Sequence, residues 1–498
     1  MHGPKHRIST GGDYGDTGKG GQNSFIIREL IEDLGLQNNP DYENAVLRDP
    51  LDVLANKPAV LSIGPNGSGN AGNNIYLPNG NKVSTHLLPP GIVWTPYAIS
   101  ILGPLKRISL ERLHKEITEA NQQGCKIVPG KNLFLDEYAT ITLPQDIALD
   151  LAMNKEMKGT RSGSGPTSAR RTARTDPRAA DLLNLDSQEV RARIEKGVRV
   201  CNAQLREFGE PEISFEETMN WLRKWTDEFS KWDRDSETKF IIRSKKLVDL
   251  ALHNPNAYLF VNGTQAPCLD LDFGSVGKTV SYGVSLHEIL KGAYLPAVPR
   301  DPDNYAIYLI KKGYVTRAGS GFFPGEFTGE KTEFLAEIGG EIGVTSGNRR
   351  RTGANNIAET RYQIDTTAPV STLLRITKLD IFGEFMEKYG PQRAIIGYKL
   401  PNGEVVDHLS FEGEFEVIWS EPYHWGKLSP EEVKKIVEQG FDVMPDGMKA
   451  YLLMEAELTG APIVAVGLGP LLNDTVTKGL YEGTIEAAKR CWQQAVSI

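Results

Sequence analysis

The sequence has few of the features that mark membrane-bound, secreted or zinc-dependent proteins. No apolar run reaches the length of a membrane-spanning helix, and the start, Met1–His6, lacks the apolar core of a signal peptide. The four cysteines lie far apart with no CxxC pair, which argues against structural zinc or a disulfide framework and favours a reducing cytoplasm. The eight histidines show no HExxH spacing, so a catalytic zinc site is not indicated.

A surplus of positive charge is also missing. The net charge of −8 and the pI near 5.7 argue against a nucleic-acid-binding surface. The 498 residues are enough to bury a large core, and 40% of them are hydrophobic. Helical and apolar strand patterns alternate along the chain, which predicts an α/β fold.

The predicted elements divide the chain into recognisable segments. We expect one domain over 1–498, with a partly inserted segment at 24–58 (polar from Gln37 to Asn56) and a mainly helical subdomain at 186–251. Helices are predicted at 24–34, 109–123, 430–439 and 447–459, the last ending at the C-cap Gly460. Strands are predicted at 59–63, 257–261, 305–310, 372–377, 394–399 and 415–419.

A glycine-rich loop near the N-terminus is the strongest local signal. Residues 11–21 read GGDYGDTGKGG, which places Asp16 and Lys19 among glycines. Glycines let successive backbone N–H groups converge on an anion without interference from Cβ atoms. The loop is not a Walker A motif, because Asp13 stands where the first glycine belongs and Gly20 follows the lysine. A phosphate cradle is therefore the functional interpretation, with an ordinary turn as the alternative.

Thr377–Asp380, with the sequence TKLD, follows a predicted strand and suits a guanine base. A carboxylate there accepts from the ring N1–H and the exocyclic amino group together, while the lysine stem covers the base. Adenine offers no such pair of donors. A solvated turn with an incidental ion pair is the alternative.

Two segments combine hydroxyl groups with arginines. In 344–353, VTSGNRRRTG, three guanidinium groups follow a Thr-Ser pair, and such forks match carboxylates and phosphates bidentately. We interpret it as a loop that holds an acidic substrate. Residues 154–181 carry Gly, Ser, Thr and many arginines, and are predicted to form a mobile, phosphate-facing loop. A monophosphate site is its simplest use, and a disordered basic linker is the alternative.

His86, in the turn His86–Ile92, is the one histidine within a motif. A lone histidine in such a turn is more often a packed structural residue than a catalyst. We keep the structural interpretation.

Taken in order, these segments resemble the adenylosuccinate synthetase family. That family shows WGDEGKG, HNAGH, HLLPSGI, GTT with GIGP, EGAQG, TTGR and TKLD. The collinear counterparts here are 14–20, 69–73, 86–92, 159–166, 262–266, 345–348 and 377–380. The resemblance spans nearly the whole chain and implies a large, mostly parallel central sheet flanked by helices, with smaller antiparallel excursions.

The resemblance implies a ligase that forms a C–N bond. In the family, GTP phosphorylates O6 of inosine monophosphate with Mg²⁺ present, and the amine of L-aspartate then displaces phosphate. The implied catalytic residues are Asp16, Lys19, Asn73 and Gln265, and the implied metal ligands are Asp16 and the carbonyl of Gly72. The implied nucleotide and phosphate contacts are Gly15, Gly18, Gly20, Asn70, Thr160, Arg174, Thr279, Lys378, Asp380, Gly467 and Gly469. The implied aspartate contacts are Thr345, Ser346 and Arg350.

Several positions depart from the family pattern. The general-acid histidine of the family is Asn73 here, which donates a hydrogen bond but cannot deliver a proton. The arginine near the ribose and the aspartate carboxylate is Asn348. Gln and Glu of the first motif are Asp13 and Thr17. These changes are expected to cluster around the purine, ribose and amino-acid pockets.

Three interpretations follow. The first is a divergent family member, virus-encoded in one reading, that acts on an inosinate-like substrate with GTP, or with ATP in its place. The second is a phage-type 2-aminoadenylosuccinate synthetase that acts on dGMP, which the lost ribose-side arginine favours. The third is a nucleotide-binding protein that has lost catalysis. Because Arg174 matches an arginine that reaches the neighbouring subunit's substrate, a homodimer is implied, in the cytoplasm (the host's, if virus-encoded).

Overall fold

The chain is described by a computed structural model over nine stretches of sequence. These are residues 4–77, 80–154, 161–233, 238–274, 278–297, 301–342, 349–367, 372–409 and 413–495. The strands are β1 His6–Gly11, β2 Ala59–Gly67, β3 Asn73–Tyr76, β4 Lys82–Thr85, β5 Ala98–Ile108, β6 Leu133–Asp136, β7 Thr140–Ile141, β8 Ile241–Ile242, β9 Ala257–Asn262, β10 Tyr305–Lys312, β11 Val315–Arg317, β12 Arg351–Gly353, β13 Thr372–Thr377, β14 Ile395–Lys399, β15 Val405–Val406, β16 Glu416–Trp419, β17 Ile463–Gly467 and β18 Thr475–Val476.

Helices separate most of these strands along the chain. They are α1 Lys19–Asp33, α2 Tyr42–Arg48, α3 Pro50–Asn56, α4 Leu110–Gln122, α5 Pro144–Met153, α6 Ser164–Thr172, α7 Gln188–Glu207, α8 Phe215–Asp233, α9 Lys245–His253, α10 Leu286–Gly292, α11 Glu330–Ile338, α12 Ile357–Thr367, α13 Leu379–Tyr389, α14 Pro430–Gln439, α15 Asp446–Thr459 and α16 Leu480–Ala495. The polar stretch 37–56 thus contains the short helices α2 and α3, and 186–251 contains α7, α8, α9 and β8. Gly460 ends α15 with a φ of 67°, as expected for a left-handed C-cap.

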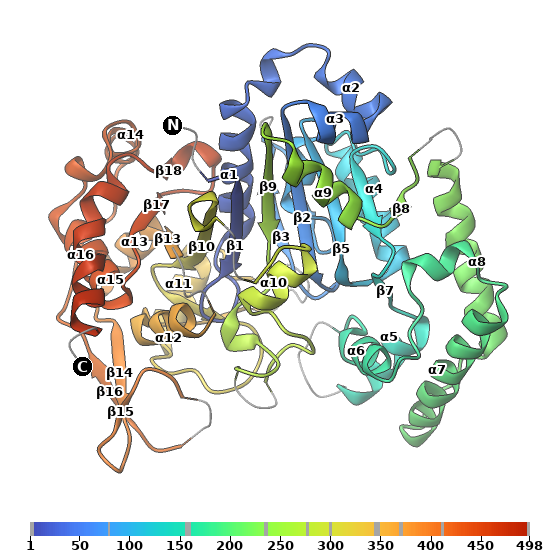
Figure 1. Cartoon of the computed structure of the whole chain (residues 1–498). Helices are drawn as coiled ribbons and strands as arrows, with labels where there is room; N and C mark the ends of the chain where they lie inside the picture. The colour runs from blue at the N-terminus through green and yellow to red at the C-terminus, as the bar shows by residue number, and fades with distance from the viewer. Residues whose placement is uncertain are drawn as a thin grey trace.

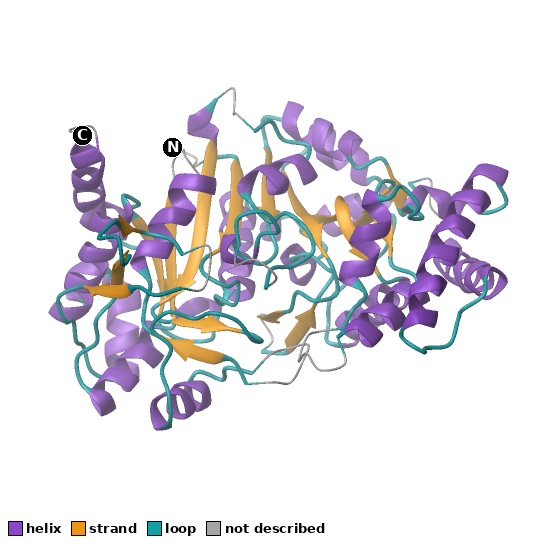
Figure 2. Ribbon diagram, turned by 90° about the horizontal axis from the view of Figure 1, so that it is seen from below, coloured by secondary structure: helices purple, strands orange, loops and turns teal. Residues whose placement is uncertain are grey.

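One large sheet forms the centre of the molecule (Figure 1). Among the described residues its order is β18-β17-β13-β10-β1-β9-β2-β5-β6-β8, with β7 paired to β5. Every pairing is parallel except that of β17 with the short edge strand β18. Helices lie on both sides of the sheet (Figure 2). The predicted fold class, α/β with a large and mostly parallel sheet, is confirmed.

The burial of the strands explains why they are apolar. All the residues of β2 and β9 are buried, as expected for parallel strands covered on both faces. The predicted strands at 59–63, 257–261 and 372–377 fall within β2, β9 and β13. Three small antiparallel sheets stand apart from the main one: β3–β4, β11–β12 and β15–β14–β16.

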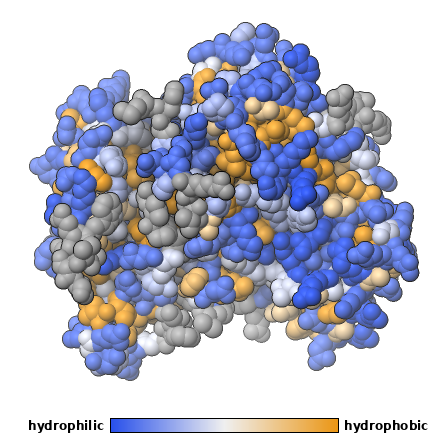
Figure 3. Space-filling view, in the orientation of Figure 1, coloured by the Kyte–Doolittle hydropathy of each residue, from blue (hydrophilic) through white to orange (hydrophobic). Residues whose placement is uncertain are grey.

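Hydrophilic residues cover most of the face seen in Figure 3. Within the described residues, none of the helices combines the length and the apolar character that a membrane span requires.

A buried carboxylate on α4 fixes the turn that contains His86. Glu116 is 5% exposed and accepts from the N–H groups of His86, Leu87 and Leu88 at 3.0, 2.9 and 3.3 Å. The ring of His86 lies with Nδ1 3.2 Å from Glu116 Oε1. Burial alone would raise the pKa of Glu116, but the hydrogen bonds from His86 and Leu87 outweigh it and hold the pKa below its ordinary value. This agrees with the structural role predicted for His86.

Replacement of Glu116 by Gln is expected to destabilise the fold by about 2 kcal/mol, since a neutral amide lacks the charge that strengthens these hydrogen bonds. Because the folded-state pKa of Glu116 is lowered, its contribution is present at neutral pH and is lost as the pH falls through that value. Urea unfolding of the wild type and E116Q measures the difference. The control is Glu119→Gln, an exposed residue of the same helix, expected to change stability by no more than about 0.5 kcal/mol. Equal stability of E116Q and the wild type would contradict this prediction.

Candidate active site

The largest set of predicted site residues lines one cavity of about 470 Å³. It lies where β1, β13 and β17 end, and the carboxyl ends of parallel strands are where α/β proteins bind ligands. The predicted residues that line it are Gly15, Asp16, Gly18, Lys19, Gly20, Gly72, Asn73, Arg350, Lys378, Asp380, Gly467 and Gly469. Segments hundreds of residues apart are therefore brought together.

The glycine loop between β1 and α1 has the backbone geometry of an anion cradle. Gly15 and Gly18 have φ values of 89° and 73°, a region that favours glycine. Gly18 is the N-cap of α1 and supplies no side-chain cap, which leaves backbone N–H groups of the first turn available to an anion. At Gly20 a Cβ atom would stand 2.7 Å from the carbonyl oxygen of Asn74, so a side chain does not fit.

Two threonine hydroxyls hold this loop in place. Thr377 Oγ1, at the end of β13, donates to the carbonyl of Thr17 at 2.8 Å. Thr316 Oγ1, on β11, donates to the carbonyl of Asp16 at 3.0 Å. The side chain of Asp16 is thus presented to the cavity from a backbone anchored on both sides.

Lys19 is buried beneath the loop. Its Nζ donates to the carbonyl of Gln265 at 2.6 Å and lies 3.3 Å from that of Gly263. Burial lowers the pKa of Lys19 to about 7. Gln265 has a φ of 62°, which turns its carbonyl toward the lysine. Lys19 and Gln265, two of the predicted catalytic residues, are therefore in contact through the backbone of Gln265.

Arg350 and Asp16 form an ion pair across the cavity. The second partner of Arg350 is Glu341, whose Oε2 lies 3.0 Å from Nη1. Burial lowers the pKa of Arg350 to about 10. Asp16, the predicted base, is thus paired with the arginine that was predicted to hold an acidic substrate.

Residues of the TKLD segment line the same cavity. Lys378 has a φ of 65° and is the N-cap of α13, with Nζ donating to the carbonyl of Gly339 at 2.6 Å. Asp380 Oδ1 is buried and has no hydrogen-bond partner among the described residues. Burial raises the pKa of this carboxyl. A buried acceptor without a partner costs free energy, so Asp380 is suited to a ligand that donates.

Other predicted residues lie outside this cavity or outside the described residues. Asn70 accepts from Ser68 Oγ at 2.7 Å and from Tyr282 OH at 3.1 Å, and Thr279 is half-buried. Thr160, Thr345 and Ser346, like Asn348, fall outside the described stretches of the chain.

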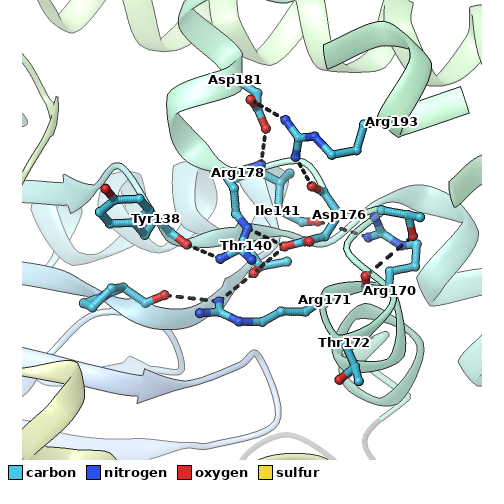
Figure 4. Close-up of polar contacts among 12 residues, drawn as sticks. Tyr138, Thr140, Ile141, Arg170, Arg171, Thr172, Asp176, Arg178, Asp181 and Arg193 are labelled. Carbon is cyan, nitrogen blue, oxygen red and sulfur yellow. Dashed lines mark hydrogen bonds and ion pairs between the residues drawn. The ribbon is translucent and has the colours of Figure 1, made fainter. Parts of the chain in front are cut away.

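The prediction of a mobile loop over 154–181 is wrong for much of that segment. Residues 164–172 form α6, and the arginines on and after this helix fold back onto the protein (Figure 4). Arg170 pairs with buried Asp146, Arg171 donates to Thr140 Oγ1 at 2.7 Å, and Arg178 lies 2.7 Å from Asp176. These arginines stabilise the packing of α6 against β7 and do not line the cavity. Arg174 is exposed and has a φ of 61°.

Sequence reasoning missed some residues and misplaced another. Glu341 and Lys312 line the cavity, and no motif marks them. Asp13 is buried away from the cavity lining, with its N–H donating to Gln363 Oε1 at 3.1 Å, and burial raises its pKa to about 6. The expectation that the departure at Asp13 belongs to a substrate pocket is therefore not met in the cavity described above.

The fold and the cavity define an α/β protein in which a glycine-rich loop and the TKLD segment line the same cavity. The adenylosuccinate synthetase family model matches residues 51–476, which is most of the chain. The chain therefore belongs to the adenylosuccinate synthetase family, whose members are ligases that form C–N bonds.

Individual relatives agree with this assignment. The adenylosuccinate synthetase of Scheffersomyces stipitis is 28% identical over 482 residues, which are 95% of this chain and 98% of the relative. The fully ligated adenylosuccinate synthetase of Plasmodium falciparum shares the fold with a TM-score of 0.73 and 22% identity, over 95% of this chain and 100% of that one. The succinoaminodeoxyadenylate synthetase of cyanophage S-2L, bound to dGMP and to dATP as an energy donor, matches with a TM-score of 0.53 and 14% identity, over 98% and 100%.

Proton uptake is expected when a nucleoside triphosphate binds above pH 7. Lys19 with a pKa of about 7 is mostly neutral at pH 8, and a triphosphate favours its charged form, so the pKa rises on binding. Calorimetry of GTP binding at pH 8, in buffers of different ionisation enthalpy, should show uptake of about one proton. Lys19→Met should abolish the uptake, whereas Lys115→Met, at an exposed position, should retain it. The same uptake in K19M would contradict the prediction.

Proposed function

We propose that this protein joins L-aspartate to C6 of a purine nucleoside monophosphate, with inosine monophosphate as the first-ranked substrate and GTP as the phosphoryl donor. The observation that carries the proposal is that Asp16, Lys19, Arg350 and Asp380 line one cavity. The cavity thereby combines four features: phosphate binding, an activating carboxylate, a cation for an acidic substrate and a carboxylate that recognises a base.

In the first step, the γ-phosphoryl group of GTP moves to O6 of the purine. The O6–P bond forms as the bond to the β-phosphate oxygen breaks, and GDP leaves. Loss of the N1 proton makes O6 more nucleophilic, and Asp16 is the base that takes it. The ammonium of Lys19 and the N–H groups at the start of α1 stabilise charge on the transferring group.

In the second step, the amine of aspartate attacks C6. The C–N bond forms, the C6–O6 bond breaks, the amine loses a proton and inorganic phosphate leaves. Oxygen bound to C6 is a poor leaving group, and its phosphorylation makes it a good one. Arg350 binds a carboxylate of aspartate in this step, together with the predicted contacts Thr345 and Ser346.

Asp380 supports GTP as the donor. Its unpartnered Oδ1 accepts from guanine N1–H, and the second carboxylate oxygen from the exocyclic amino group. Adenine offers no such pair of donors, so GTP is preferred to ATP. Lys378 covers the base with its aliphatic stem, next to the Gly467–Gly469 turn that lines the same cavity.

A magnesium ion fits the donor set. The described residues include no group of three or more His, Cys, Asp or Glu side chains that could hold a metal by themselves. Mg²⁺ is commonly bound by one or two carboxylates together with substrate phosphates, and Asp16 and the carbonyl of Gly72 line the phosphate end of the cavity. When bound, the ion would neutralise charge on the phosphates of GTP.

Asn73 replaces the general-acid histidine of the family and lines the same cavity. Its amide donates a hydrogen bond to a phosphoryl oxygen but carries no transferable proton. The active form is proposed to be a homodimer, since exposed Arg174 is the counterpart of a residue that acts on the neighbouring subunit's substrate. Asn70, Thr160, Gln265 and Thr279 are proposed to contact the monophosphate. A cytoplasmic location stays a prediction.

The test is phosphate release with GTP or ATP, L-aspartate, and each of IMP, dIMP and dGMP. We expect release that requires all three substrates and is fastest with GTP and IMP. Asp16→Asn should lower turnover at least about 100-fold, because the base is lost. The control Asp33→Asn, at the far end of α1 and 46% exposed, should stay within about twofold of the wild type.

Other outcomes of this assay have defined meanings. Release with dGMP, but with neither IMP nor dIMP, would replace the proposal with the 2-aminoadenylosuccinate synthetase interpretation. No release with any substrate at micromolar enzyme would contradict an active ligase and leave nucleotide binding without catalysis.

A further inference from the structure

Glu341 is a buried carboxylate that the proposed reaction does not use. Its side chain is 1% exposed and accepts hydrogen bonds from three residues. Lys312 Nζ lies 2.7 and 2.8 Å from its two oxygens, Tyr314 OH lies 2.7 Å from Oε1, and Arg350 Nη1 lies 3.0 Å from Oε2. Two of these donors are cations, and one of them is the arginine proposed to bind aspartate.

Two carboxylates and two cations form a connected set of ion pairs around Glu341. Glu341 and Asp16 carry the negative charges, and Lys312 and Arg350 carry the positive ones. Lys312 is 2% exposed and also donates to Thr316 Oγ1 at 3.1 Å, the hydroxyl that holds the carbonyl of Asp16. An incoming carboxylate that takes the place of Asp16 on Arg350 keeps the guanidinium paired and leaves Asp16 without this cation.

The guanidinium of Arg350 has two carboxylate partners, and the contact with Glu341 is held more rigidly than the contact with Asp16. Backbone contacts reinforce the side-chain contact with Glu341. The N–H of Arg350 donates to the carbonyl of Glu341 at 3.0 Å, and Ile342 and Arg349 form an isolated antiparallel β-bridge. Toward the cavity, the partner is Asp16, whose side chain is 31% exposed. The contact with Glu341 is therefore fixed, and the contact with Asp16 is exchangeable.

We propose that Glu341 is a positioning residue for the amino-acid substrate: it holds the guanidinium of Arg350 at the cavity edge while Arg350 exchanges Asp16 for a carboxylate of aspartate. This rests on the proposed function. A guanidinium has five N–H donors, so the contact with Glu341 leaves a fork that matches a second carboxylate. The exchange also releases Asp16 to act on the purine.

The experiment compares KM for aspartate, GTP and IMP in the wild type and in Glu341→Gln. Gln keeps the shape but loses the charge that holds Arg350, so KM for aspartate should rise about tenfold while the KM values for GTP and IMP stay within about twofold. The matched control is Glu326→Gln, which removes the carboxylate paired with the neighbouring Arg351 and should leave KM for aspartate unchanged.

Loss of a buried charge also threatens folding, and two features of the experiment distinguish a folding defect from the loss of Arg350 positioning. KM does not depend on the fraction of enzyme that is folded. The double variant E341Q/K312Q removes both buried charges together, and it should show the same rise in KM for aspartate.

A double-mutant cycle decides whether Glu341 acts through Arg350. In an Arg350→Gln background, E341Q should raise KM for aspartate by less than about twofold, whereas an independent structural effect would multiply with that of R350Q. If the wild type turns over and E341Q keeps the wild-type KM for aspartate, this inference alone is overturned. It is also overturned if the effects of E341Q and R350Q on that KM multiply. A wild type without aspartate-dependent turnover would overturn the proposed function and the inference with it.

Discussion

Two hydroxyl-to-carbonyl hydrogen bonds, from Thr377 to Thr17 and from Thr316 to Asp16, fix the loop on which the site depends. Glycines give that loop the freedom to wrap an anion, but freedom alone would leave Asp16 without a defined position. The threonines stand on β13 and β11, so the loop after the first strand is tied to segments from the second half of the chain. Every proposed role of Asp16 requires this constraint.

Around the loop, ionisable groups have shifted pKa values or ion-pair partners that bound ligands would change. Burial lowers the pKa of Lys19 and raises that of Asp380, so each favours its neutral form more than it would in water. Arg350 is paired with Asp16 instead of a substrate. In the proposed reaction, a triphosphate would supply a new partner to Lys19, a guanine base to Asp380 and an amino-acid carboxylate to Arg350. The charges of the site thus complement those of the proposed ligands, which is a physical reason for binding these ligands together.

Much of this could be predicted from sequence because the signals are local. The glycine loop and TKLD could be recognised as local motifs, whereas the strand β1 before the loop was not predicted. Both motifs lie at strand ends, and parallel strands bring their carboxyl ends to one edge. The α/β class and the helix end at Gly460 follow from the same local rules, whereas α1 begins at Lys19, before the predicted start at residue 24. The role of His86 was predictable too, although its partner Glu116, on α4, was not.

Contacts between distant segments were beyond such reasoning. Glu341 has no motif, and its role depends on Lys312, Tyr314 and Arg350 meeting in the fold. Arg170 and Arg171 were misassigned because composition does not distinguish an arginine that faces solvent or phosphate from one that pairs with a buried aspartate. The roles of Asn70, Gln265, Thr279 and Arg174 stay predictions.

The central claim is that the purine oxygen becomes the bridging oxygen of a phosphoester. Inosine monophosphate labelled with ¹⁸O at position 6 tests it directly, with mass spectrometry of the phosphate released in the presence of GTP and aspartate. The account predicts one ¹⁸O atom in each phosphate. Phosphate without the label, formed together with the aspartate adduct, would contradict it.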